Sequence, residues 1–154
     1  MDIRQEVITL LERAKADIQA QMQAKKINAS GRTSASLHVE SYDGGVRLVG
    51  GGQGTAPFPT LEIGREGGAV PQGFYYIIKQ WSCDKGIQFA RESERSTFAY
   101  FLARKIAREG TARHKSPEDV YSTVVTQAVA SINEVLGRYV NSGVARVFGI
   151  KSNF

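Results

Sequence analysis

Residues 98–111 read Phe98-Ala-Tyr-Phe-Leu-Ala-Arg-Lys-Ile-Ala-Arg-Glu-Gly-Thr111. This pattern predicts an amphipathic helix, because at about 100° per residue the apolar side chains share one face while Arg104 and Arg108 stand together on the far side. The apolar face consists of Phe98, Ala99, Leu102, Ala103 and Ile106. Gly110 is the residue type most able to take a positive φ past a helix end. We therefore expect one face of this helix to pack, the other to meet something polar, and the helix to end near Gly110.

Upstream of this stretch, the pattern predicts a helix followed by a hairpin. Apolar residues that repeat every three or four positions indicate an N-terminal helix, and they are Ile3, Val7, Leu10, Leu11, Ala14, Ile18 and Met22. The small, polar residues 28–36 predict a loop. Residues 37–42 and 46–50 alternate apolar and polar side chains around Asp43-Gly44-Gly45, which is typical of a β-hairpin. Residues 60–64 are compatible with a third short strand.

Two further helices are predicted on either side of the opening stretch. The first carries Phe74, Ile77, Ile78 and Trp81 at helical spacing and is expected to end just before Gly86. The second is expected to begin at Ser116-Pro-Glu-Asp119, since a capping hydroxyl precedes a proline and acidic residues. Its apolar repeat runs to about Asn141, and residues 144–150 fit either more helix or a closing strand.

Together these elements predict an α+β fold. We expect an antiparallel sheet of about three to four strands, packed with an N-terminal helix and about three further helices. A length of 154 residues suits a single domain over 1–154. Within it, residues 144–154 are expected to form an extended or partner-contacting C-terminal tail.

Composition argues against a membrane or disulfide-based protein. The longest apolar runs fall far short of the ~20 residues that a spanning helix needs. An export signal has an apolar segment followed by a small-residue cleavage site, and the N-terminus shows neither. We therefore expect an intracellular protein at synthesis. Cys83 is the single cysteine and has no partner for an internal disulfide.

Positive charge is concentrated in one part of the chain. The formal net charge is +5, and residues 91–115 carry seven Lys or Arg residues against three Glu. This excess suits a polyanionic partner, but a solvated helix face with a charged loop explains it equally well.

Signatures of catalysis and of cofactor binding are missing. Residues 50–54 are glycine-rich but lack the third glycine and the following helix of a dinucleotide loop, and no phosphate-binding P-loop occurs. His38 and His114 have no second histidine or carboxylate at metal-ligand spacing. We therefore expect no cofactor, no metal and no enzymatic activity.

Five motifs in a fixed order carry a resemblance. They are Pro59-Thr-Leu-Glu-Ile-Gly-Arg65, Gly67-Gly-Ala-Val-Pro71, Ile77-Ile-Lys-Gln-Trp81, Lys85-Gly-Ile87 and Ala99-Tyr-Phe-Leu-Ala-Arg-Lys-Ile-Ala-Arg-Glu-Gly-Thr111. The series resembles the tail-completion proteins of tailed double-stranded DNA phages, also called head-tail joining or neck proteins. The likeness covers roughly residues 28–121, and its motifs are structural, with no catalytic signature.

The resemblance implies a structural virion protein made in the host cytoplasm. Such a protein is a small α+β subunit of a homo-oligomeric ring, a hexamer or larger, between the head connector and the tail tube. Double-stranded DNA would pass through the ring without sequence-specific contacts, and no membrane is involved. A ring needs one patch on each subunit that meets a different patch on its neighbour. Residues 74–76, the Gly/Pro loops and residues 147–150 are candidates for such contacts.

The candidate interface or DNA-channel residues are Arg65, Arg104, Lys105, Arg108 and Arg113. The planar fork of arginine suits both a neighbour's carboxylates and phosphates. We favour the neighbour, because each neutralised phosphate adds affinity and would hinder DNA that must move. The alternative is a free nucleic-acid-binding module in which Arg104, Arg108, Arg113 and Lys115 meet phosphates. An enzyme is a third, weaker hypothesis.

Overall fold

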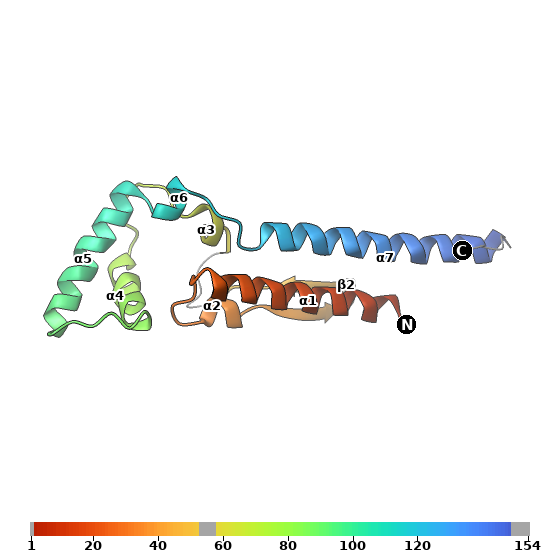
Figure 1. Cartoon of the computed structure of the whole chain (residues 1–154), viewed down its shortest axis with the longest axis horizontal. Coiled ribbons are helices and arrows are strands. Elements are labelled where there is room, and N and C mark those ends of the chain that lie inside the picture. The colour runs from red at the N-terminus through yellow and green to blue at the C-terminus, as the bar shows by residue number, and fades with distance from the viewer. Residues whose placement is uncertain (1, 53–57, 149–154) are drawn as a thin grey trace.

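The computed structural model describes residues 2–52 and 58–148, and their fold is α+β with helices predominant. Figure 1 shows an elongated molecule, in which the N-terminal helix, the hairpin and the last helix lie together at one end and a helix pair stands at the other. The elements are α1 (Ile3–Ala24), α2 (Arg32–Ala35), β1 (His38–Tyr42), β2 (Gly45–Val49), α3 (Phe58–Ile63), α4 (Phe74–Asp84), α5 (Glu92–Glu109), α6 (Ala112–Lys115) and α7 (Ser122–Phe148).

The first hydrophobic core lies between α1, the hairpin and α7. Helix α1 buries Ala14, Ile18 and Met22, which are spaced four residues apart on one face. The same cluster includes Leu37, Leu61, Val120 and Val124. The predicted N-terminal helix is therefore confirmed, and its apolar face packs against the first turns of α7.

The predicted hairpin is also confirmed. Strands β1 and β2 pair antiparallel, with His38 opposite Val49 and Tyr42 opposite Gly45. The Arg4 guanidinium of α1 donates hydrogen bonds to the carbonyl oxygens of Tyr42 and Gly45, at 2.7 and 3.2 Å. The turn end of the hairpin is thereby attached to the start of α1.

The expected sheet of three to four strands is wrong for the described residues, whose sheet has two strands. Residues 60–64 are not a strand, since α3 covers most of them. Leu61 is buried, whereas Ile63 is 55% exposed. A strand would place these two side chains on the same face, but on a helix they lie about 200° apart. Pro59 is tolerated because it lies in the first turn, where its nitrogen has no helical partner.

A second hydrophobic core joins α4 and α5. It contains Ile78 of α4 with Ala99 and Ala103 of α5, and half-buried Phe74, Tyr75, Leu102 and Ile106 pack on it. Both predicted helices are confirmed. Gly86 and Gly110, with φ of 70° and 77°, follow their ends as expected. Helix α5 begins at Glu92, six residues earlier than the opening stretch.

Helix α7 begins later than the sequence predicted. It starts at Ser122 rather than at Ser116-Pro117, because the N–H groups at its start are bound by a side chain from α3, described below. Of the two alternatives for residues 144–150, helix is observed up to Phe148. Residues 149–154, the rest of the expected tail, and residues 53–57 of the glycine-rich loop lie outside the described part of the chain.

Candidate functional site

The Gly-Arg loop after α3 and the Gly-Thr end of α5 contact each other directly. The Arg65 N–H donates to Thr111 Oγ1 at 2.9 Å, and the Thr111 N–H donates to the Arg65 carbonyl oxygen at 2.9 Å. These residues are 46 positions apart in the chain. We call this contact, with Gly64, Gly67 and Gly110 around it, the clasp. It joins two of the motifs that carry the resemblance.

Glycine is required in the clasp by close backbone approach. A Cβ atom at Gly64 would collide with His114 N and Thr111 Oγ1, and one at Gly67 would collide with the Arg108 carbonyl oxygen. At Gly110 a Cβ atom would lie 2.7 Å from the Arg65 carbonyl oxygen. No side chain fits at these positions without displacing backbone.

The Arg65 side chain organises the loop that leads to α4. Its guanidinium donates to the Ala69 carbonyl oxygen at 3.0 Å and stacks over the Phe74 ring, 5.0 Å from the centroid. Arg65 is half-buried. Its observed contacts therefore lie within the chain and orient the start of α4.

Arg104, Lys105 and Arg108 lie exposed on the outer side of α5, and we call them the basic triplet. They stand opposite Ala99, Ala103 and Ala107, which are at most 2% exposed. The Arg104 guanidinium bonds Tyr100 Oη at 2.9 Å and lies over the Tyr100 ring, and Arg108 pairs with the adjacent Glu109 at 3.1 Å. The small alanine side chains keep α5 close to its neighbours while the triplet faces outward.

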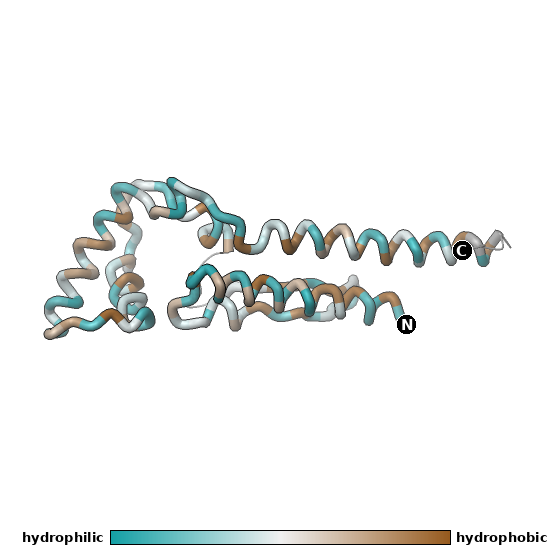
Figure 2. Tube along the Cα trace, in the orientation of Figure 1, coloured by the Kyte–Doolittle hydropathy of each residue, from teal (hydrophilic) through white to brown (hydrophobic). Residues whose placement is uncertain are grey.

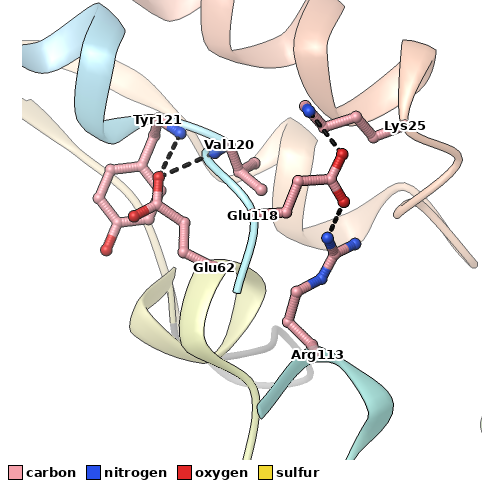
Figure 3. Close-up of polar contacts among 6 residues, drawn as sticks. All are labelled: Lys25, Glu62, Arg113, Glu118, Val120 and Tyr121. Carbon is pink, nitrogen blue, oxygen red and sulfur yellow. Dashed lines mark hydrogen bonds and ion pairs between the residues drawn. The ribbon is translucent and has the colours of Figure 1, made fainter. Parts of the chain in front are cut away.

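Arg113 occupies a different environment from the basic triplet. It pairs with Glu118, whose carboxylate also accepts a 2.6 Å bond from the Lys25 ammonium at the end of α1 (Figure 3). These two ion pairs connect α6 and the segment before α7 to the end of α1. Arg113 thus serves a link between segments of its own chain.

Glu62 is the most strongly perturbed group among the described residues, and sequence reasoning missed it. Its carboxylate accepts hydrogen bonds from the backbone N–H groups of Val120, Tyr121 and Ser122 at 2.6–2.9 Å, two of which Figure 3 shows. Partial burial raises the pKa of Glu62, but the bonds from Ser122 Oγ and from these three N–H groups outweigh burial and lower the pKa from 4.5 to about 2. Glu62 therefore caps α7 from α3.

The expected interface residues 74–76 divide between core and surface. Phe74 and Tyr75 pack in the α4–α5 core, whereas Tyr76 is 72% exposed. Glu62 is visible in the sequence as an acidic residue three positions before Arg65. Nothing in the local sequence connects it with Tyr121, so its capping role could not be predicted.

Two chemical features bear on ligands. Within residues 2–52 and 58–148, no three His, Cys, Asp or Glu side chains come together as metal ligands. None of the helices in those ranges has the length and apolarity that crossing a membrane requires.

Comparison of the chain with protein-family models, with curated proteins and with solved structures gives no match.

Proposed function

We propose that this chain is a structural virion protein of a tailed phage, which completes the tail and joins it to the head connector. It acts as one subunit of a homo-oligomeric ring, a hexamer or larger, through which double-stranded DNA passes. The observation that carries the proposal is the clasp, because residues of the motifs behind the resemblance contact one another there. Motifs that serve backbone packing suit a protein that works through its shape and performs no reaction.

We propose fewer residues for partner contacts than the five candidates named from the sequence. The basic triplet is exposed and available to a neighbouring subunit's carboxylates or to the channel. Arg65 and Arg113 instead make contacts within the chain, so we assign them to the rigidity of the subunit. The neighbours in the particle would be the head-connector and tail-tube proteins.

Two measurements test this function. Electron micrographs of the purified protein are expected to show closed rings with a central opening. Deleting the gene from the phage that encodes it is expected to leave DNA-filled heads and separate tails. Fully joined, infectious particles without the protein would contradict the proposal.

A nucleic-acid-binding module is the second candidate, and the exposed basic triplet is the observation that favours it. Such a module would bind DNA with an affinity that falls steeply as salt rises. A lack of measurable DNA binding at low salt would eliminate this candidate.

A further inference from the structure

Helix α7 has a second apolar face that nothing in the described chain covers. Its first face, with Val124 and Val135, is buried in the molecule. Seven other large apolar residues of α7 are 40–79% exposed, among them Tyr139 and Val144. The remaining five share one face, and we call them the α7 stripe: Val125, Val129, Leu136, Val140 and Val147. At about 100° per residue these five fall within a sector of about 60°, roughly 120° around the helix from the buried face. The stripe is therefore one continuous surface.

The spacing of the α7 stripe suits a straight helix-sized partner. Val125, Leu136 and Val147 are eleven residues apart, as are Val129 and Val140. Eleven residues make three turns plus only about 20°, so the stripe runs almost parallel to the helix axis. Figure 2 shows apolar residues recurring along α7, including the part that extends past the N-terminus of α1.

The composition of α7 indicates that the stripe is covered in the working state. Among its 27 residues, only Glu134, Arg138 and Arg146 are charged. A helix that is apolar on more than one side is normally buried on more than one side. A large apolar surface left in water marks a site of association.

The size of the exposed surface indicates that this chain works within an obligate assembly. The chain exposes 10627 Å², whereas a folded monomer of 16.8 kDa exposes about 7,700 Å². The excess, about 2,900 Å², is of the size that obligate assemblies bury, roughly 2,000–5,000 Å² in total. In the proposed ring the occupant is a second copy of this chain, because every subunit meets a neighbouring copy.

We propose that the α7 stripe binds a neighbouring copy of this chain. The inference rests on the proposed ring, of which the stripe would be one of the two unlike patches on each subunit. It also explains why the last turns of α7, which extend beyond α1 in Figure 1, are helical although no other element of the described residues lies beside them.

The test compares two double variants of equal charge and spacing. Val129→Glu with Val140→Glu places two carboxylates on the stripe, and Ala130→Glu with Asn141→Glu places them one residue further on, at exposed positions off the stripe. Light scattering during size-exclusion chromatography gives the mass of each, and circular dichroism checks that each is helical. We expect the wild type and the Ala130/Asn141 variant to form the same oligomer. The stripe variant is expected to associate about 100-fold more weakly or worse and to approach 16.8 kDa.

Each outcome of this test either supports or overturns the inference. A stripe variant that keeps the wild-type mass overturns the inference and leaves the ring proposal standing. A stripe-dependent oligomer of two chains supports the inference and contradicts the ring. A wild type that stays at the mass of one chain at every concentration overturns the inference. If the stripe variant loses its helical signal, hydrogen exchange of the wild type decides: amides of residues 136–147 must become more protected as concentration rises, and unchanged protection overturns the inference.

Discussion

The Glu62 carboxylate of α3 accepts a 2.6 Å hydrogen bond from the backbone N–H of Tyr121, 59 residues later in the chain. The same carboxylate oxygen also accepts from Val120 and Ser122, so one side chain satisfies three N–H groups at the start of α7. A helix start leaves four such groups without a helical partner. The longest helix of the molecule is thus begun by a residue of one of the shortest, and α3 and α7 depend on each other.

Replacing Glu62 by glutamine is expected to lower the free energy of unfolding by about 1 kcal/mol. Glutamine still accepts hydrogen bonds, but its neutral amide loses the attraction between a negative charge and the helix N-terminus. Urea unfolding at neutral pH measures the change. Glu66→Gln is the control, because Glu66 is exposed on the next loop. An equal effect of both substitutions would show that the cap contributes nothing particular.

Acid is expected to remove the Glu62 contribution over a defined range. The pKa of Glu62 is about 2 in the folded protein and 4.5 when the carboxylate lacks these hydrogen bonds. Between these values the unfolded chain binds more protons, so stability falls as pH falls. The contribution is fully present above about pH 5 and declines toward pH 2. The difference in unfolding free energy between wild type and Glu62→Gln should therefore shrink from pH 6 to pH 3; a constant difference would contradict the assignment.

Helices and turns with local signals were predictable from the sequence. The repeat of α1, the Gly-containing turn of the hairpin and Gly110 after α5 each act within a few residues, and all three predictions are confirmed. The prediction of a strand at residues 60–64 was wrong because four alternating residues fit a strand as well as a short helix. The choice between strand and helix depends on the contact of Leu61 with the core residues of α1. Tertiary contact overrode the local pattern.

The candidate site was predictable in its residue types but not in its contacts. The exposure of the basic triplet agrees with the predicted polar face of the helix over residues 98–111. The inward roles of Arg65 and Arg113 depend on Phe74 and Glu118, and the cap on α7 depends on Glu62. No spacing rule connects residues that are brought together by a loop, so these contacts required the structure.

Alanine at Gly67 is expected to destabilise the protein by about 1–3 kcal/mol, because its Cβ would press on the Arg108 carbonyl oxygen. Gly68→Ala is the matched control, since a Cβ there meets nothing within 4 Å and neither glycine has a positive φ. The control should change the unfolding free energy by less than about 0.5 kcal/mol. Thermal and urea unfolding of both variants measure the difference. Equal effects would mean that the clasp is not tightly packed in solution.

The hydroxyl of Thr111 is expected to matter more than its size. Its Oγ1 accepts from the N–H of Arg65 at 2.9 Å and from that of His114 at 3.3 Å. Thr111→Val keeps the shape but leaves the half-buried Arg65 N–H without its acceptor, at a cost of about 1–2 kcal/mol. Thr111→Ser retains the hydroxyl and should recover most of the loss in urea unfolding. A serine variant as unstable as the valine variant would show that the methyl group matters as much as the hydroxyl and would contradict this prediction.

Removing the basic triplet is expected to weaken subunit association without harming the fold. Arg104→Ala, Lys105→Ala and Arg108→Ala together remove exposed side chains. A surface ion pair such as that of Arg108 with Glu109 contributes about 0–1 kcal/mol. A control variant with Arg13, Lys26 and Arg91 changed to alanine removes the same charge from other exposed positions. Oligomer mass at low and high salt, with urea unfolding, separates assembly from stability, because salt screens exposed charge pairs. If the triplet variant instead keeps its mass and loses salt-dependent DNA binding that the control retains, the outer face of α5 contacts phosphates rather than a neighbouring subunit.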